Sequence, residues 1–215
     1  MGKVLKIDLT TKEVSEYPFS DRERELFIGG KTMAAKILGD HLKGTEKAFS
    51  TENLLVITTG PLTGTGAPSA SRFNISTVSP QTGYITSSNC GGHFGYYLKK
   101  AGLDALILTG QCEEKTWIEI QNDSVKFHNA DDLWGMKTTR TQEALDDKLR
   151  MKNGRVEKTE NLYRAGRRKS GIIFQHRFND RVSGRGGTGA VMGWMRLKAV
   201  CVSAQRKFRF MIRKR

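Results

Sequence analysis

Three short segments rich in glycine and small polar residues hold the side chains best suited to binding chemistry. They cover residues 60–72, 87–95 and 183–193. Glycine lets backbone N–H groups approach an anion closely, and each segment lies at the end of an expected strand or the start of an expected helix. Arg72 and Arg185 add guanidinium groups that can bind a phosphate through two hydrogen bonds. The pattern indicates phosphate binding, although a single segment of this kind is more often only a tight turn.

The common nucleotide and metal motifs are missing. Residues 184–189 read GRGGTG, which is not GxGxxG, and no GK[ST] follows at P-loop spacing. The histidines stand far apart, at His41, His93, His128 and His176, and the cysteines are few and scattered, at Cys90, Cys112 and Cys201. A nicotinamide dinucleotide, ATP, a zinc site and a disulfide framework are therefore not indicated. For His93 and Cys90, which lie inside a glycine-rich segment, a structural role is the more common one.

The positive charge is concentrated in the last third of the chain. The 215 residues carry a formal net charge of +14; residues 1–150 hold 18 Lys and Arg against 19 Asp and Glu, whereas residues 151–215 hold 18 against 3. Such a block suggests a module that binds nucleic acid or an acidic partner. Nucleic acid is the weaker interpretation, because the aromatic residues there follow no repeating pattern. No apolar run approaches the roughly 20 residues that span a bilayer, so we expect a cytoplasmic protein without a membrane segment.

The elements expected to position these segments describe an α+β domain. A hairpin is predicted over residues 4–17, a helix after the N-cap candidates Ser20 and Asp21, and a second helix over 31–38 that stops at Gly39 and Asp40. Strands are predicted at 53–59, 71–78, 83–88, 105–109, 116–120, 124–128 and 197–202. Helices are predicted from Phe94, with Gly102 after its end, and over 141–150. Residues 151–170 predict neither strand nor helix.

Taken in order, the segments resemble the N-terminal domain of the tungsten-dependent aldehyde ferredoxin oxidoreductases. The matching motifs are GPLTGTGAP at 60–68, SRFN at 71–74, SPQTG at 79–83, SNCGGHFG at 88–95, KAGLD at 100–104 and GRGGTGAVMG at 184–193. GKVLKIDLT at 2–10 and LWG at 133–135 match as well. The resemblance covers nearly all of residues 1–150 and resumes at about 172–207.

The resemblance implies a fold and a chemistry. The fold is α+β, with duplicated layers of sheet and helix that form the base on which two pterins lie. Enzymes of this family oxidise aldehydes to carboxylic acids and pass the electrons through a 4Fe-4S cluster to ferredoxin. Tungsten, or molybdenum in some relatives, is held by the dithiolenes of two pyranopterins whose phosphates share a magnesium ion.

The resemblance also implies the cofactor-binding residues, which are Arg72, Asn89, Cys90, Gly91, Arg185, Gly186, Gly187 and Gly189. Arg72 would contact a pterin phosphate, and the backbone carbonyls near Asn89 and Gly186 would face the magnesium. Oxygen atoms suit such a hard cation. No catalytic residue is assigned, because the family's acid and base residues and its cluster cysteines lie beyond this domain.

Two segments depart from the family. Residues 1–206 are assigned to the N-terminal domain, but 151–170 are degenerate and 207–215 form an unrelated basic tail. A truncated or frame-shifted product would explain the basic excess, and an inactive remnant is the alternative to a working enzyme. A working enzyme would need the missing C-terminal domains or a homo-oligomer partner, with ferredoxin as acceptor.

Overall fold

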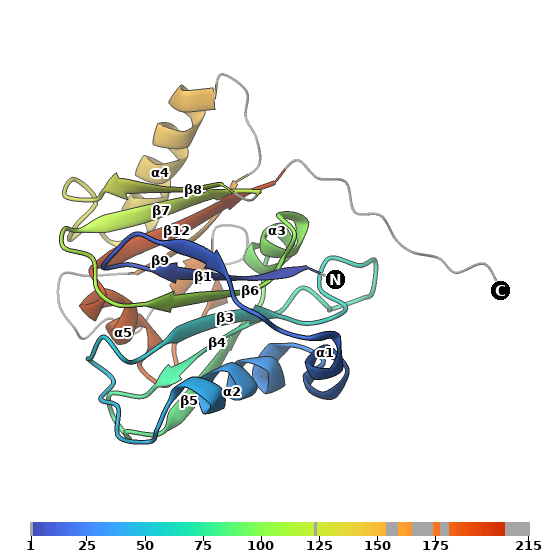
Figure 1. The fold of residues 1–215 in the computed structure, drawn as a ribbon. Helices are drawn as coiled ribbons and strands as arrows, with labels where there is room; N and C mark the ends of the chain where they lie inside the picture. The colour runs from blue at the N-terminus through green and yellow to red at the C-terminus, as the bar shows by residue number, and fades with distance from the viewer. Residues whose placement is uncertain (1, 123, 154–158, 165–173, 177–180, 205–215) are drawn as a thin grey trace.

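Two six-stranded sheets form the frame of the protein. The structure, a computed structural model, describes residues 2–122, 124–153, 159–164, 174–176 and 181–204. Two assignments fall wholly or largely outside these ranges: the tail at 207–215 and most of the degenerate segment 151–170. In Figure 1 the two sheets lie one above the other with helices above, between and below them.

The first sheet has the strand order β2-β1-β6-β3-β4-β5. Its strands are β1 (Lys3–Asp8), β2 (Val14–Glu16), β3 (Leu55–Thr59), β4 (Phe73–Val78), β5 (Ile85–Cys90) and β6 (Leu103–Thr109). Three helices belong to this half of the chain: α1 (Asp21–Phe27), α2 (Gly30–His41) and α3 (Phe94–Lys100). Among the described strand pairs of this sheet, only β1 and β6 are parallel.

The second sheet repeats this plan, with the strand order β8-β7-β12-β9-β10-β11. Its strands are β7 (Thr116–Gln121), β8 (Ser124–Asn129), β9 (Thr159–Arg164), β10 (Phe174–His176), β11 (Arg181–Val182) and β12 (Leu197–Ser203). The helices are α4 (Thr138–Asn153) and α5 (Thr188–Trp194), and β12 pairs in parallel with β7. The pair α5 and β12 follows α3 and β6 at a constant distance of 94 residues. The prediction of a duplicated α+β fold is confirmed.

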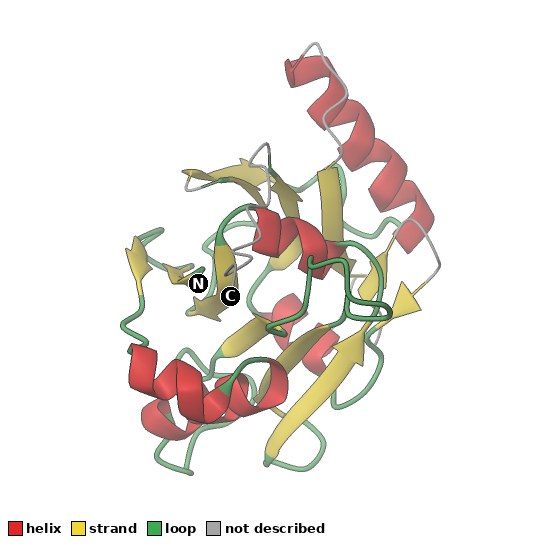
Figure 2. Cartoon of the chain, turned by 90° about the vertical axis from the view of Figure 1, so that its right-hand side faces the viewer, coloured by secondary structure: helices red, strands yellow, loops and turns green. Residues whose placement is uncertain are grey.

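Three apolar cores hold the layers together. The central core lies between the sheets, where α3 and α5 contact strands of both, and it contains Leu5, Ile57, Leu106 and Val200. A second core packs α2 on the outer face of the first sheet, and a third packs α4 on the outer face of the second. Figures 1 and 2 show this order of layers from two sides. Burial of both faces explains why every residue of β6 and β12 is buried.

The parallel strand pair of each half contains one irregularity at the same place. The register of β1 with β6 shifts so that Asp104 has no direct partner, and the register of β12 with β7 shifts at Lys198. Both side chains are buried. Asp104 pairs with Arg24 at 2.8 Å and with Lys99, whereas Lys198 donates to the carbonyl of Met136 at 3.1 Å. Equivalent backbone positions therefore carry opposite charges.

Two helix boundaries, the start of α1 and the end of α3, were predicted from local signals. Ser20 and Glu23 form a capping box at the start of α1, in which the Glu23 amide donates to Ser20 Oγ at 3.2 Å. Gly102 follows α3 with φ +90° and donates to the Lys99 carbonyl. The predicted end of the second helix at Gly39 and Asp40 is wrong, since α2 continues to His41.

The prediction that residues 151–170 contain neither strand nor helix is wrong in two places. The helix α4 continues to Asn153, and β9 occupies Thr159–Arg164. This polar strand pairs antiparallel with β12 on one side and with β10 on the other. Its hydrogen bonds come from tertiary pairing with β12, whose own residues are all buried, so local composition could not reveal it.

Candidate functional site

The three glycine-rich segments converge around the β4–β5 hairpin. Residues 60–72 join β3 to β4, residues 91–93 join β5 to α3, and residues 183–187 lead into α5. Phe73 pairs with Cys90 and Asn74 with Asn89 across the hairpin, so the end of the first segment lies beside the second.

The third segment lies against the same hairpin, although it comes from the other half of the chain. The Arg185 amide donates to Ser88 Oγ at 3.2 Å. A Cβ atom at Gly186 would overlap the Thr86 hydroxyl, and one at Gly187 would lie 2.6 Å from Pro80 Cγ. Both glycines have φ near +70°, a conformation that other residues rarely adopt. Glycine is therefore required here both by backbone geometry and by contact.

The first segment also packs against the start of α3. A methyl group at Gly95 would lie 3.1 Å from Phe73 Cβ and 3.6 Å from the carbonyl oxygen of Arg72. The Thr63 side chain fills the space beside it, with Cγ2 at 3.5 Å from the same point. The structure thus places Arg72 next to the helix that follows Asn89, Cys90 and Gly91.

The predicted site residues differ in how much of their surface is open. The side chains of Arg72, Asn89 and Arg185 are exposed, and Gly91, Gly186 and Gly187 are partly exposed. Cys90 is only 3 % exposed and its side chain belongs to the central core. Gly189 is buried within α5. Cys90 and Gly189 therefore position the loops, and only their backbone atoms could face a ligand.

Two hydroxyl groups at the third segment were not predicted as site residues. Ser183 Oγ and Thr188 Oγ1 are buried and have no hydrogen-bond partner in the described part of the chain. They flank Gly184–Gly187 in the sequence. Buried hydroxyls are usually hydrogen-bonded in folded proteins, so these two groups have hydrogen-bonding capacity that the described residues do not use. Together with the exposed guanidinium groups of Arg72 and Arg185, they fit an anionic group such as a phosphate.

The histidines and the other two cysteines differ in their surroundings. His128 stacks on Trp117 with ring centroids 4.1 Å apart and contacts Glu119 at 2.9 Å. His93 is exposed at the start of α3. Burial raises the pKa of the Cys112 and Cys201 thiols, which disfavours their thiolate forms. Within the described ranges, no group of three or more His, Cys, Asp or Glu side chains could hold a metal ion.

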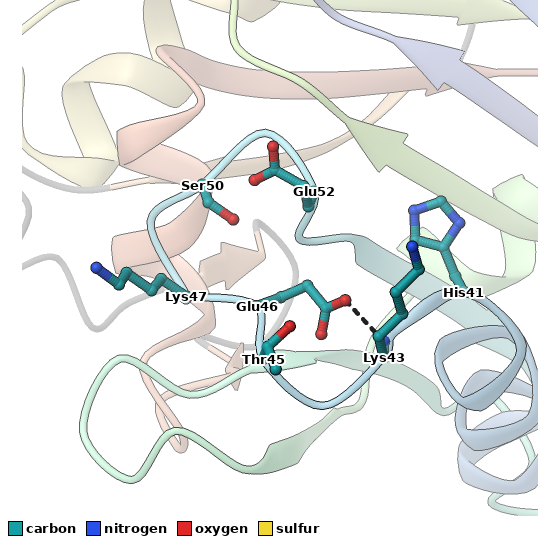
Figure 3. Close-up of a pocket in the computed structure, with 7 residues that line it drawn as sticks. All are labelled: His41, Lys43, Thr45, Glu46, Lys47, Ser50 and Glu52. Atoms are coloured by element: carbon teal, nitrogen blue, oxygen red, sulfur yellow. Dashed lines mark hydrogen bonds between the residues drawn. The ribbon is translucent and has the colours of Figure 1, made fainter.

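An open hollow of about 610 Å³ lies elsewhere, on the loop between α2 and β3 (Figure 3). It is lined by His41, Lys43, Thr45, Glu46, Lys47, Ser50 and Glu52. The Glu46 carboxylate accepts hydrogen bonds from the backbone amides of Lys43 at 2.7 Å and Gly44 at 2.9 Å. These bonds lower the pKa of Glu46, and the bond from Lys43 has the largest effect. None of the predicted site residues lines this hollow, and the Glu46 carboxylate is already engaged by its own loop.

The fold and the site define a duplicated α+β domain that holds two glycine-rich, arginine-bearing loops beside one hairpin. The sequence profile of the aldehyde ferredoxin oxidoreductase N-terminal domain matches residues 4–204. This chain therefore belongs to the aldehyde ferredoxin oxidoreductase family, as its N-terminal domain. In the described residues, no helix is both long enough and apolar enough to cross a membrane.

Curated relatives and a solved structure agree with this assignment. The chain is 35% identical over 212 residues to a tungsten-containing aldehyde ferredoxin oxidoreductase of Thermococcus kodakarensis, which covers 96% of this chain and 34% of that protein. It is 31% identical to the WOR-like subunit of an aliphatic sulfonate oxidoreductase of Pyrococcus furiosus, over 93% of this chain and 34% of that subunit. The chain thus spans about a third of these relatives.

The solved structure is the active-site complex BamBC of benzoyl coenzyme A reductase in complex with 1,5-dienoyl-CoA. Its TM-score is 0.87 at 34% sequence identity, and the match covers 95% of this chain and 31% of that one.

Proposed function

We propose that this chain supplies the base for a tungsten or molybdenum bis-pyranopterin cofactor in an enzyme that oxidises aldehydes to carboxylic acids. The observation that carries the proposal is the contact of residues 185–187 with the β4–β5 hairpin. This contact places the loop before α5 of the second half against the hairpin whose second strand, β5, leads into residues 91–93 of the first half. Two equivalent loops on one surface suit a ligand with two similar anionic parts.

Each loop has its own part in this proposal. Arg72 binds a pterin phosphate, and the backbone of residues 89–91 lines one pterin. Arg185 and the backbone of Gly186, Gly187 and Gly189 would hold the other, and the carbonyls of Asn89 and Gly186 would offer oxygen ligands to a magnesium ion. The bound cofactor supplies the redox chemistry, whereas the chain binds and orients it.

The remaining chemistry belongs to other parts of the enzyme. The whole chain has three cysteines, all buried, so it cannot provide the four thiolates of a 4Fe-4S cluster. We infer that the cluster, the contact with ferredoxin and the acid and base residues come from domains that correspond to the remaining two thirds of the relatives, in a cytoplasmic enzyme.

The substrate is set outside this domain. The matched proteins are named for aldehydes, an aliphatic sulfonate and benzoyl coenzyme A, although each shares this domain at 31–35% identity. A domain common to such different substrates can hold a shared cofactor but does not select among them.

Arginine substitutions in the complete enzyme test the assignment. Arg72→Ala and Arg185→Ala should each lower the bound pterin and metal, because each removes charge-assisted hydrogen bonds to a phosphate. Arg185→Lys keeps the charge but loses the two-point geometry and should fall in between. Arg140→Ala, at an exposed site on α4, is the control. Full pterin and metal content in both alanine variants would contradict the proposed roles.

A further inference from the structure

The loop of residues 61–72 has a single buried side chain. Thr63 is 1 % exposed, whereas every other residue from Pro61 to Arg72 is partly or fully exposed. A loop with so little apolar burial gains its order from hydrogen bonds and backbone geometry. The Thr63 side chain is where those bonds meet.

The Thr63 hydroxyl joins the two ends of this loop. It accepts a hydrogen bond from the Gly60 amide at 3.1 Å, and its oxygen lies within donating distance of the carbonyls of Ala70 at 3.1 Å and Arg72 at 3.0 Å. The Thr63 amide in turn donates to the Gly60 carbonyl at 3.1 Å. One side chain thus fixes the first residue of the loop and the carbonyl of Arg72.

The methyl group of Thr63 fixes the loop in a second direction, because it packs beside Gly95 in the first turn of α3. The residue after Arg72 in the chain is Phe73, which is 1 % exposed in β4. The backbone of Arg72 is therefore held from both neighbours, while its guanidinium group remains exposed.

We propose that Thr63 is the positioning residue of the Gly60–Arg72 loop, and that it holds Arg72 where its side chain can bind an anionic group such as a phosphate. This inference rests on the proposed function for the role of Arg72. This role needs a hydroxyl that both accepts and donates a hydrogen bond, and the methyl group only adds packing. Serine retains the hydroxyl, whereas valine retains only the shape.

Three variants of the full chain test the proposal by amide hydrogen exchange. In Thr63→Val the Gly60 amide loses its acceptor and should exchange at least about tenfold faster, while Thr63→Ser should remain within about threefold of the unmodified chain. Thr65→Val is the matched control, because the Thr65 hydroxyl donates to the Leu62 carbonyl at 2.7 Å within the same loop. It should leave Gly60 protected. Unchanged exchange at Gly60 in Thr63→Val would overturn the proposal.

Binding of inorganic pyrophosphate to the same proteins tests the consequence for Arg72. Arg72→Ala should weaken binding, Thr63→Val should weaken it by a similar factor, and the double variant should add little, since both changes remove one interaction. Thr63→Ser should bind normally. A loosened loop with full Arg72-dependent binding would overturn the positioning role. If the unmodified chain does not bind pyrophosphate, the anion-binding role of Arg72 in this chain is contradicted, and the exchange at Gly60 still decides whether Thr63 holds the loop.

Discussion

The two halves of the domain share one topology but stabilise equivalent positions by different chemistry. At the strand irregularity, the first half places Asp104 between Arg24 and Lys99, and the second half places Lys198 against the Met136 carbonyl. Before the third helix of the first half stands an exposed Asn89; at the position 94 residues later stands the buried Ser183. Strand pairing therefore fixes the topology of each half, whereas the neighbouring side chains and carbonyls decide whether an acidic or a basic residue can be buried there.

The same comparison applies to the two binding loops. The end of β5 offers an exposed amide side chain at Asn89, whereas the loop before α5 and the first residue of that helix offer the guanidinium group of Arg185 and two buried hydroxyls. A duplicated frame therefore presents two chemically distinct loops, and a ligand with two similar parts would be held differently at each.

The largest expected effect comes from breaking the charge cluster of the first half. Asp104→Asn leaves Arg24 and Lys99, whose side chains are 12% and 16% exposed, without their carboxylate. We expect a loss of about 3 kcal/mol in the free energy of unfolding, measured by urea denaturation. Glu143→Ala, which breaks an exposed ion pair with Arg140, should stay close to the unmodified chain. Equal stabilities for the two variants would show that Asp104 is not needed at its position.

A smaller effect is expected where the two halves touch. Gly186→Ala adds a methyl group that overlaps Thr86, at a φ of +70°, and should lower the free energy of unfolding by about 2–3 kcal/mol. Gly83→Ala is the matched control, because its φ is +74° and nothing lies within 4 Å of the added atom. It should lose only about 1 kcal/mol from backbone strain. If both variants lose the same amount in urea, the loop of the second half does not rest on the hairpin.

The smallest expected effect concerns the capping box of α1, which contains an acidic residue, Glu23. The hydrogen bonds from Ser20 lower the pKa of Glu23 to about 2, whereas the first turn of α4 has no acidic residue. A lowered folded pKa stabilises α1 above the ordinary value of 4.5, and this stabilisation is lost as the pH falls toward about 2. NMR titration should give a pKa of about 2 for Glu23 in the unmodified chain. In Ser20→Ala this pKa should move up toward 4.5. An unchanged pKa in Ser20→Ala would exclude the capping box as its cause.

The sequence revealed those parts of the fold that local chemistry decides. Ser20 and Glu23 marked the start of α1, and Gly102 marked the end of α3, because caps depend on neighbouring residues. The predicted end of α2 at Gly39 was wrong, because burial of Ile37 and Leu38 against the first sheet stabilises the helix beyond this glycine. The strand β9 could not be found, since its pairing partners lie elsewhere in the chain.

The candidate site divides in the same way. Glycine, arginine and spacing pointed to the three loops, but no local pattern showed that residues 185–187 meet Thr86 and Ser88 of the other half. Thr63, Ser183 and Thr188 were missed as individual residues. The only signal for the last two was their place at either end of Gly184–Gly187, and for Thr63 there was none, because its importance comes from being the one buried side chain of its loop.

Metal and pterin analysis of the purified chain is the most direct test of whether this domain is the base of a bis-pyranopterin cofactor. The chain should be expressed in an anaerobic host that makes the cofactor, alone and together with a chain that carries the remaining two thirds of a relative. If this domain is the base of the cofactor, the paired preparation should contain tungsten or molybdenum with about two pterins per metal, because the domain has two loops that can each bind one pterin. Absence of metal and pterin from both preparations would contradict the assignment of this domain as the base of the cofactor.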